Sequence, residues 1–462
     1  MTEQIPVVQA FDRAFIAHVA ADDTSALEKK LQLAAETLRD RRGWLTVQQR
    51  GEILLRCAQL LKGRQHEFTT LIAREGGKPW NDAEVEVIRA IDGLKNASEE
   101  LRSFAGREIP MGLNAASAGR WAFTTKEPIG VVAAISAFNH PLNLIVHQVA
   151  PAIAVGCPVI VKPAIATPLC CLKLVELLRE ASLPEAWCQT FITADNALAE
   201  KLAVDPRVAF VSFIGSARVG WYLRSKLPPG TRCALEHGGA APVIVDRSAK
   251  LDQIVSPIVK GGYYHAGQVC VSVQRIFVHQ SIVSDFISKL TERVLALNVG
   301  DPLSKDTEMG PLITPNEASR VQQWIDEARR AGAQVIGGGA LSETTLKPCV
   351  VVEPAAQAKV SQLEIFGPVT CVYTFQELDR AVEIANSLPF AFQASVFSSD
   401  IEPAMRAAKY LDASTVLIND HTAFRTDWMP FAGRRQSGYG VGGIPYTMSE
   451  MSQEKMIVTK FA

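Results

Sequence analysis

Short apolar runs rich in β-branched residues alternate with longer helical patterns from about residue 131 onward, and this rhythm constrains the fold most. The runs that predict strands are 131–137, 158–162, 190–193, 208–213 and 233–235. The patterns that predict helices between them are 142–155, 166–181, 195–203 and 217–226. Continuously apolar strands are typical of a parallel sheet that helices cover on both faces. The pattern therefore predicts a doubly wound α/β sheet, which binds ligands at the carboxyl ends of its strands.

A second series of the same kind follows the first. Its expected strands are 241–246, 275–278, 333–336, 350–352, 369–374 and 416–418. Ahead of the first series, 25–75 and 82–104 have the apolar spacing of amphipathic helices, and 120–126 alternates like a strand. A chain of 462 residues can bury two or three cores. We therefore expect two α/β domains, with further elements at the N-terminal side.

Charge and cysteine content exclude several classes of function. Lys and Arg total 47 against 48 Asp and Glu, and no basic tract interrupts the mixture, so a nucleic-acid partner is not expected. The nine cysteines show no paired CxxC spacing, and no metal site is expected. The apolar stretches are shorter than the ~20 residues of a membrane helix, and the first residues lack a basic-then-apolar signal. We expect a cytoplasmic protein with no membrane partner.

Two reactive side chains stand at sharp turns. Gly267-Gln268-Val269-Cys270 presents a cysteine on a small flexible turn, where it can act as a nucleophile. A buried core thiol is the ordinary alternative. Glu236 ends the expected strand 233–235 and precedes Gly238 and Gly239, so it sits where an acid or base would act. A solvated loop glutamate is its ordinary alternative.

Three further strand ends carry polar groups. Asn139 follows the strand 131–137 and can donate to an oxyanion, although asparagine is also a common helix cap. Lys162 can reach a ribose or phosphate, or remain solvated. Gly215-Ser216 joins a strand to a helix, a junction that can seat a phosphate. It lacks the GxGxxG spacing, so by itself it is a weak dinucleotide signature.

Taken together, these segments resemble the aldehyde dehydrogenase superfamily over nearly the whole chain. The matching segments are 139–141, 162–164, 214–216, 236–239, 267–270, 364–368 and 430–433. The resemblance implies two doubly wound parallel-sheet domains and a small β arm for oligomerisation. The implied parts are a dinucleotide-binding domain (1–105 and 129–238), a catalytic domain (239–440) and an arm (106–128 and 445–462). The arm implies a homodimer or a homotetramer.

The resemblance also implies a reaction, the oxidation of a small-molecule aldehyde. Cys270 would attack the aldehyde to give a thiohemiacetal and then a thioester. The side-chain amide of Asn139 and the backbone N–H of Cys270 would hold the oxyanion. Glu236 matches the general base that activates water. Because members that transfer the acyl group to coenzyme A generally lack this glutamate, a free carboxylic acid is the expected product.

The cofactor expected from the resemblance is NAD or NADP. Lys162 matches the residue that contacts the adenosine ribose, and the Gly215-Ser216 junction with Val219 matches the pyrophosphate site. Glu364 and Phe366 match the pair that holds the nicotinamide ribose. The chain departs from many NAD-preferring members at the third residue after the lysine, where an acid is replaced by Ile165. Without that charge NADP should be tolerated, and the preference stays open.

The expected substrate is a short aldehyde that carries a hydroxyl or anionic group. Arg425 can clamp an anion with two hydrogen bonds, and His140 is a second donor; alternatively, Arg425 pairs with Asp427 or another acid. The sequence of segments 139–147, 236–242 and 419–430 resembles the branch of the family that acts on lactaldehyde and phosphonate-bearing aldehydes. His237 and His265 depart from the family pattern, and a structural role is expected for both.

Two other classes of function remain open at this point. A cysteine hydrolase would use Cys270 with His265 or His237 as its base and would need no dinucleotide. A catalytically silent binding protein could share the same fold. The first leaves Glu364 and Phe366 unexplained, and the joint presence of Cys270, Glu236 and Asn139 argues against the second.

Overall fold

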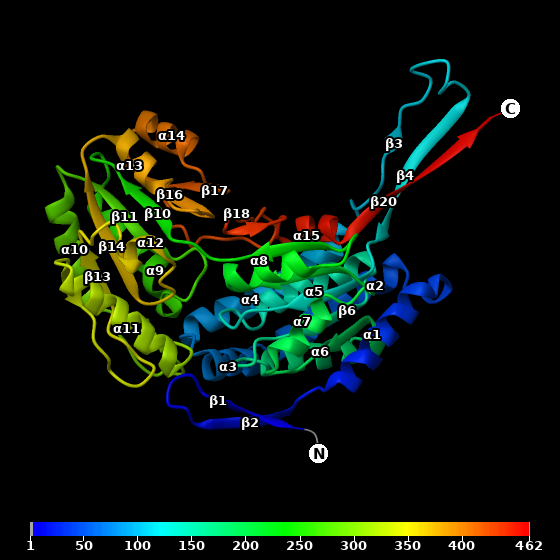
Figure 1. The fold of residues 1–462 in the computed structure, drawn as a ribbon, viewed down its shortest axis with the longest axis horizontal. Helices are drawn as coiled ribbons and strands as arrows, with labels where there is room; N and C mark the ends of the chain where they lie inside the picture. The colour runs from blue at the N-terminus through cyan, green and yellow to red at the C-terminus, as the bar shows by residue number, and fades with distance from the viewer. Residues whose placement is uncertain (1–2, 462) are drawn as a thin grey trace.

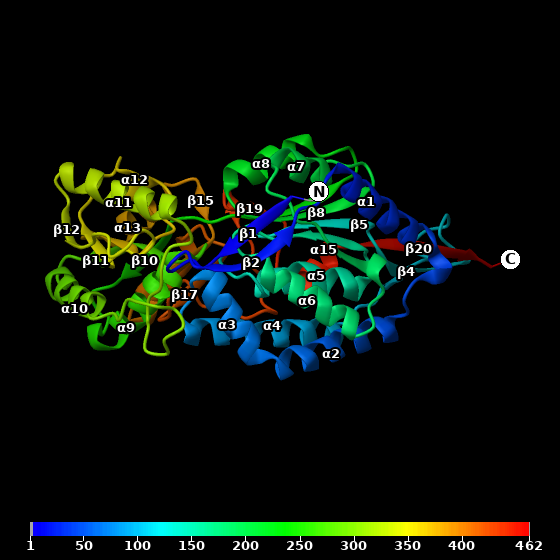
Figure 2. The same ribbon diagram turned by 90° about the horizontal axis from the view of Figure 1, so that it is seen from below.

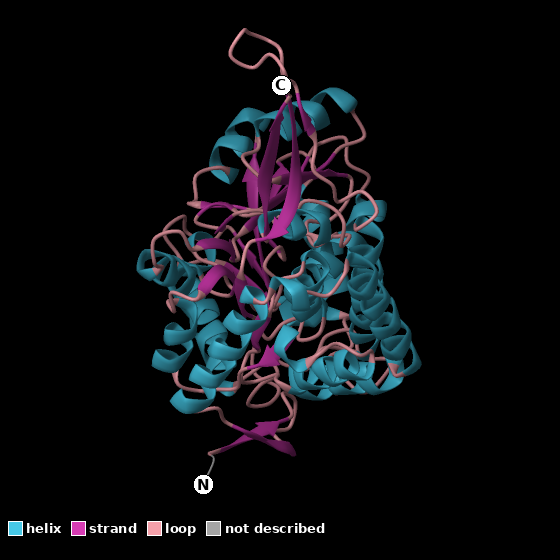
Figure 3. Cartoon of the chain, turned by 90° about the vertical axis from the view of Figure 1, so that its right-hand side faces the viewer, coloured by secondary structure: helices cyan, strands magenta, loops and turns pink. Residues whose placement is uncertain are grey.

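The computed structural model describes residues 3–461. Two α/β lobes, each built on its own sheet, lie side by side, and a three-stranded arm projects from the first lobe (Figure 1). A narrow hairpin made by the N-terminal residues lies on the side opposite the arm (Figures 1 and 3). The two predicted parallel-sheet lobes are thus observed.

The sheet of the first lobe runs in the order β19-β9-β8-β5-β6-β7. Its strands are β5 (Val131–Ile135), β6 (Val159–Lys162), β7 (Cys188–Thr190), β8 (Val208–Ile214), β9 (Arg232–Glu236) and β19 (Gly438–Tyr439). The strands from β5 to β9 pair in parallel, as their apolar runs predict. β19 lies about 200 residues further along the chain and pairs antiparallel with β9, Gly438 opposite Glu236, so a later segment closes this edge.

Helices cover both faces of this sheet because successive strand residues point in opposite directions. In β5, Val132 and Ala134 face one helical layer, while Val131, Ala133 and Ile135 face the other. The first layer contains α2 (Val47–Gly63), α3 (Gln65–Gly76), α4 (Trp80–Glu100), α5 (Asn143–Val155), α6 (Leu169–Glu180) and α15 (Ile444–Glu450). The second contains α1 (Thr24–Arg39), α7 (Asn196–Ala203) and α8 (Ala217–Lys226).

The sheet of the second lobe runs in the order β12-β13-β14-β11-β10-β16-β17. Its strands are β10 (Ala241–Val245), β11 (Val273–His279), β12 (Gln334–Gly337), β13 (Cys349–Val352), β14 (Val369–Phe375), β16 (Gln393–Phe397) and β17 (Thr415–Ile418). Two features differ from the expectation. β12 pairs antiparallel at the edge, and β16, which the sequence pattern missed, occupies a place between β10 and β17.

Helices also sandwich the second sheet. One face packs against α9 (Leu251–Tyr263), α10 (Val283–Leu295), α11 (Pro315–Arg330) and α12 (Lys359–Gln362). The other face packs against α13 (Leu378–Ala385) and α14 (Ile401–Tyr410). A short pair of strands, β15 (Phe390–Ala391) and β18 (Arg434–Arg435), joins antiparallel near the seam between the lobes.

The arm consists of β3 (Glu108–Ile109), β4 (Arg120–Pro128) and β20 (Ser452–Lys460), all antiparallel. Residues 444–450, which sequence reasoning placed largely in the arm, instead form α15 and pack against α4 and α5. An unpredicted hairpin of β1 (Gln4–Val8) and β2 (Phe15–Ala20) crosses the first lobe (Figure 2). Among the described residues, no helix is long and apolar enough to cross a membrane.

Candidate active site

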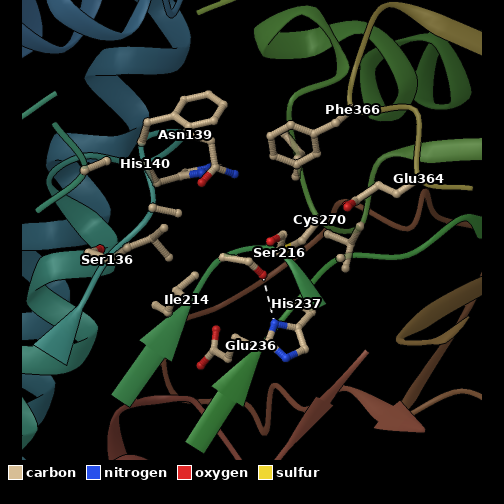
Figure 4. A pocket seen from close by; sticks show the side chains of 18 of the residues that line it. Ser136, Asn139, His140, Ile214, Ser216, Glu236, His237, Cys270, Glu364 and Phe366 are labelled. Carbon is tan, nitrogen blue, oxygen red and sulfur yellow. Dashed lines mark hydrogen bonds between the residues drawn. The ribbon is translucent and has the colours of Figure 1, made fainter. Parts of the chain in front are cut away.

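A cavity of about 810 Å³ lies between the two lobes, at the carboxyl ends of β5, β8 and β9. This is the position where open α/β sheets bind ligands, and the volume is typical of a ligand site. Of the sequence-predicted residues, its lining includes Asn139, His140, Gly215, Ser216, Glu236, Cys270, Glu364, Phe366 and Arg425. Figure 4 shows how the residues from the two lobes face each other across this cavity.

Cys270 stands on a strained turn after α9. His265, Ala266 and Gly267 all adopt positive φ angles, of 49°, 53° and 70°. A side chain at Gly267 would meet the carbonyl oxygen of Gly367 at 2.2 Å, so this position requires glycine. Cys270 is partly exposed to the cavity, whereas the other eight cysteines in the described chain are buried.

The Cys270 thiol is protonated in this environment. Burial raises its pKa to about 12, and the positive charge of Arg425 opposes that shift. Because the thiolate is the nucleophilic form, the thiol needs a base or an added positive charge before it can attack.

The side chain of Asn139 reaches across the seam to the cysteine turn. Its Nδ2 donates a buried hydrogen bond of 3.0 Å to the carbonyl oxygen of Gln268. The Gln268 side chain in turn donates to the carbonyl of Pro311 and accepts from the backbone N–H of Ile313. The amide of Asn139 is thereby held beside the segment that carries Cys270.

Glu236 ends β9 on the wall of the same cavity. Burial raises the pKa of its carboxyl, and the charge of Arg425 partly compensates. A side chain at Gly442 would approach Glu236 Oε1 to 2.1 Å, so the returning segment near β19 packs directly over this carboxyl. A carboxylate with a raised pKa is a stronger base than one in water, which suits proton abstraction.

The two unusual histidines are both buried. His237 Nδ1 is 2.8 Å from the carbonyl oxygen of Gly215, and its backbone N–H donates to the carbonyl of Ser437. His237 thus braces the junction between β8 and α8. His265 is fully buried, and burial together with the charge of Lys78 holds its pKa well below the ordinary value.

The cofactor candidates divide into two groups. Gly215 and Ser216 line the cavity where β8 ends and α8 begins. Among the described residues, Lys162 and Val219 lie outside this lining. Lys162 is half-buried and its Nζ lies 3.5 Å from the carbonyl oxygen of Pro163, while Val219 is 38% exposed on α8.

Glu364 and Phe366 lie on the second-lobe wall. Burial raises the pKa of Glu364 to about 8, and its Oε1 is a buried atom with no partner among the described residues. Gly238 permits this approach, because a side chain there would meet Glu364 Oε1 at 1.5 Å. Phe366 packs edge-on against Phe138, with ring centres 5.8 Å apart. An unpartnered carboxyl oxygen beside an open cavity fits a ligand that donates hydroxyl groups, such as a ribose.

Asp427 belongs to a network that sequence reasoning did not foresee. Its carboxylate accepts hydrogen bonds from Arg89, from His147 at 2.7 Å and from Asn143 at 3.1 Å. Burial alone would raise its pKa, but the hydrogen bond from His147 and the charge of Arg89 hold that pKa below its ordinary value. No local sequence motif indicates that Arg89 and His147 contribute to the site, since both lie inside helices.

Arg425 is therefore free of Asp427, contrary to the alternative in which the two form a pair. It forms no salt bridge with a carboxylate of residues 3–461. One guanidinium nitrogen lies 3.2 Å from Nδ1 of His147, and the group lies over the ring of Phe431 at 3.5 Å from its centre. A cation bordering the cavity without a carboxylate partner is suited to an anionic ligand.

The network defines the state of His147. Its Nε2–H donates to Asp427 and its Nδ1 accepts from Arg425, so the ring is neutral. Burial, together with the charge of Arg425, lowers the pKa of His147 to about 4. Within the described chain, no cluster of three or more His, Cys, Asp or Glu side chains could hold a metal ion.

A pH dependence of stability follows. An unfolded chain protonates this histidine near pH 6.5 and the folded chain only near pH 4, so stability is lost as the pH falls through that window. His147→Gln keeps a donor and an acceptor but cannot titrate. Its thermal unfolding midpoint should therefore fall less than that of the wild type between about pH 7 and about pH 4.5. Equal falls in both proteins would contradict the neutral assignment.

Comparison with known proteins agrees with this geometry. The model of the aldehyde dehydrogenase family matches residues 1–457. The chain is 36% identical over 458 residues to 3-sulfolactaldehyde dehydrogenase from Priestia aryabhattai, covering 99% of this chain and 95% of the relative. It is 34% identical over 418 residues to lactaldehyde dehydrogenase from Methanocaldococcus jannaschii, covering 90% and 88%.

A solved structure agrees as well. The glyceraldehyde-3-phosphate dehydrogenase of Methanocaldococcus jannaschii, complexed with NADP, superposes with a TM-score of 0.95 at 31% identity, covering 100% of both chains. Sequence and fold both match over nearly the whole length of the chain, and together they assign its family. The chain belongs to the aldehyde dehydrogenase family.

Proposed function

We propose that this enzyme oxidises a short aldehyde that carries an anionic or a hydroxyl group to the free carboxylic acid, through a thioester on Cys270. NAD(P)-dependent aldehyde oxidation follows from membership of the family. The observation that carries the finer proposal is the convergence of Cys270, Asn139 and Glu236 on one cavity that Arg425 also borders. The Cys–His hydrolase alternative has less support, because His237 is bonded to a carbonyl and His265 is buried.

The first step forms a carbon–sulfur bond. Cys270 Sγ attacks the carbonyl carbon, and the π electrons move onto the oxygen to give a thiohemiacetal oxyanion. Because the thiol pKa is about 12, its proton must leave first and passes to water in the cavity, a loss that the positive charge of Arg425 favours. The Asn139 amide and the backbone N–H of Cys270 donate to the oxyanion. Removing one such donor typically costs ~3 kcal/mol of transition-state stabilisation.

The second step oxidises the carbon and the third releases the product. Oxidised NAD(P), when bound, supplies a hydride acceptor and a positive charge near the thiol. As the C–H bond breaks with its electron pair, the oxyanion reforms a C=O bond and leaves a thioester on Cys270. Glu236 then removes a proton from water, and the resulting hydroxide adds to the thioester carbon. Cleavage of the C–S bond releases the carboxylic acid and returns the Cys270 thiolate.

The residues present fit the dinucleotide. Gly215 and Ser216 would hold its pyrophosphate with Val219 beside them, and Lys162 would contact the adenosine ribose. Glu364, with its unpartnered buried oxygen, and Phe366 would hold the nicotinamide ribose. Ile165 packs in an apolar cluster with residues of the N-terminal hairpin and carries no charge to repel a 2′-phosphate. We therefore propose that the enzyme uses both NAD and NADP as cofactors.

The charge around Arg425 supports an anionic substrate. Arg89 is already paired with Asp427, whereas Arg425 retains donors for a ligand, and His140 borders the same cavity. Two similar proteins are named for aldehydes that carry a sulfonate and a phosphate. A guanidinium can hold either group, or a carboxylate, with two parallel hydrogen bonds.

Residues 1–105 and 129–238 are proposed as the dinucleotide-binding domain, and 239–440 as the catalytic domain. We also propose that the arm, expected at 106–128 and 445–462 and reduced at its second part to β20 because 444–450 form α15, makes the chain a homodimer or homotetramer. Its outer strand β20 is almost entirely exposed and shows Met456, Ile457 and Val458 to solvent. Unpaired, exposed strand edges are usually covered by another chain.

Replacing the nucleophile and the base should separate the steps. Cys270→Ala should form no product, whereas Glu236→Gln should give a burst of reduced cofactor and then turn over ~100-fold more slowly or worse. Mass spectrometry of the quenched Glu236→Gln protein should find the acyl group on Cys270. Cys233→Ala, which removes a buried thiol outside the cavity lining, is the control. Product accumulation with Cys270 unmodified in the wild type would refute the mechanism.

Cofactor choice can be tested at Ile165. Ile165→Asp should lower kcat/KM for NADP by ~10-fold or more, because its carboxylate repels the 2′-phosphate. Ile165→Asn introduces a side chain of nearly the same shape as aspartate but without its charge, and it should leave kcat/KM for NADP unchanged. A wild-type preference for NAD above about a thousandfold, or ~4 kcal/mol, would show that the absence of an acid does not admit NADP.

Substrate charge can be tested at Arg425. Arg425→Gln should raise KM for an anionic aldehyde by ~10-fold or more, the loss expected for one charge-assisted hydrogen bond or more. A neutral aldehyde of the same chain length is the matched control and should keep its KM. An unchanged KM for every sulfonate-, phosphate- and carboxylate-bearing aldehyde would remove Arg425 from substrate binding.

A further inference from the structure

A buried ion pair lies directly behind the segment that carries Asn139. Lys78, in the turn between α3 and α4, donates to the carboxylate of Glu86 on α4, and both side chains are 1% exposed. Burying two charges is unfavourable unless they satisfy further hydrogen-bonding groups. The second oxygen of Glu86 meets that condition, because it accepts hydrogen bonds from two backbone N–H groups.

Those N–H groups begin α5. Glu86 Oε1 accepts from Leu142 at 2.9 Å and from Asn143 at 3.0 Å. In the described chain no local side chain caps this helix, whose cap position is Leu142. The first N–H groups of a helix have no partners within it, and a carboxylate at that end is favoured by the helix dipole. Glu86 therefore supplies from α4 the cap that the sequence of α5 lacks.

The capped turn is the continuation of the Asn139 segment. Asn139, His140 and Pro141 lead directly into Leu142, and the carbonyl of His140 accepts from the N–H of Leu144 in the first turn of α5. The Asn139 side chain is held at its other end by the Gln268 carbonyl. Movement of the α5 terminus would therefore turn the amide relative to Cys270.

We propose that Lys78 and Glu86 are positioning residues for the oxyanion step, because they fix the first turn of α5 and so orient the Asn139 amide. This inference rests on the oxyanion role proposed for Asn139. Lys78 donates to one oxygen of the buried Glu86 carboxylate, and the other oxygen accepts the two backbone hydrogen bonds. Neither residue lines the cavity between the lobes, so each acts through Asn139.

The chain contains a matched control. Glu75, on α3, is also fully buried and caps α6, accepting from the N–H of Leu169 at 2.9 Å with one carboxyl oxygen and from the N–H of Cys170 at 3.0 Å with the other. The helix it caps follows the Lys162 segment instead of the Asn139 segment. Loss of this cap should cost stability in a similar way, without acting through Asn139.

The experiment is a double-mutant cycle on the full-length enzyme. Lys78→Met with Glu86→Leu removes the pair together, and Lys78→Met with Glu86→Gln removes the charges but keeps the accepting oxygen. Each pair is made with and without Asn139→Ala, and kcat, KM and the thermal midpoint are measured. The Leu pair should lower kcat by ~10-fold with KM within ~3-fold, and the Gln pair should recover kcat to within ~3-fold of the wild type.

The effect of the Lys78 and Glu86 variants should depend on whether Asn139 is present. In Asn139→Ala, the Leu pair should change kcat by less than ~2-fold, because the group being positioned is gone. Glu75→Leu should change kcat by one and the same factor in both backgrounds. If the Leu pair does not fold, Lys78→Met alone serves the same cycle. Equal losses from the Lys78 and Glu86 variants in both backgrounds would overturn the inference and leave the proposed function intact. A wild-type kcat in Asn139→Ala itself would overturn the oxyanion role and the inference with it.

Discussion

One hydrogen bond across the seam, from Asn139 Nδ2 to the carbonyl oxygen of Gln268, is the constraint on which the site depends. It joins a turn of the first lobe to the turn of the second lobe that ends in Cys270. The Gln268 side chain extends the same connection to the 311–313 segment. The oxyanion site that we propose takes its donors from both lobes, so it requires that their separation be held to within a fraction of an ångström, and buried hydrogen bonds provide that rigidity.

Burial and a few charges define the chemistry of the cavity. Removal from water raises the pKa of Cys270 to about 12 and that of Glu364 to about 8, and it also raises that of Glu236. Arg425 is the cation that opposes these shifts at both Cys270 and Glu236. The same guanidinium is thus suited to hold an anionic ligand and to favour the ionised forms of Cys270 and Glu236, the proposed nucleophile and base. Its link to His147 ties this electrostatic role to the Asp427 network.

The pattern of apolar residues predicted those strands that are apolar along their whole length. All five expected strands of the first sheet are present within a few residues, and the helices between them follow. The pattern missed β16, because Gln393, Ala394 and Ser395 make its first half polar or small although the strand is buried. It also gave no sign that β12 runs antiparallel or that β19 closes the first sheet. Pairing between distant segments depends on tertiary packing, which no local window contains.

By itself, the sequence determined the chain order of the motifs, the fold class and the residue types placed at the strand ends, since these depend on local apolar periodicity and on residue identity. Only the tertiary structure decided which groups pair. It assigned Asp427 to Arg89 and His147 and left Arg425 at the cavity, and it set Glu86 at the start of α5. The reason is physical: a buried charge takes as its partner whatever the packing brings within hydrogen-bond distance, and residues hundreds of positions apart become neighbours only when the chain has folded.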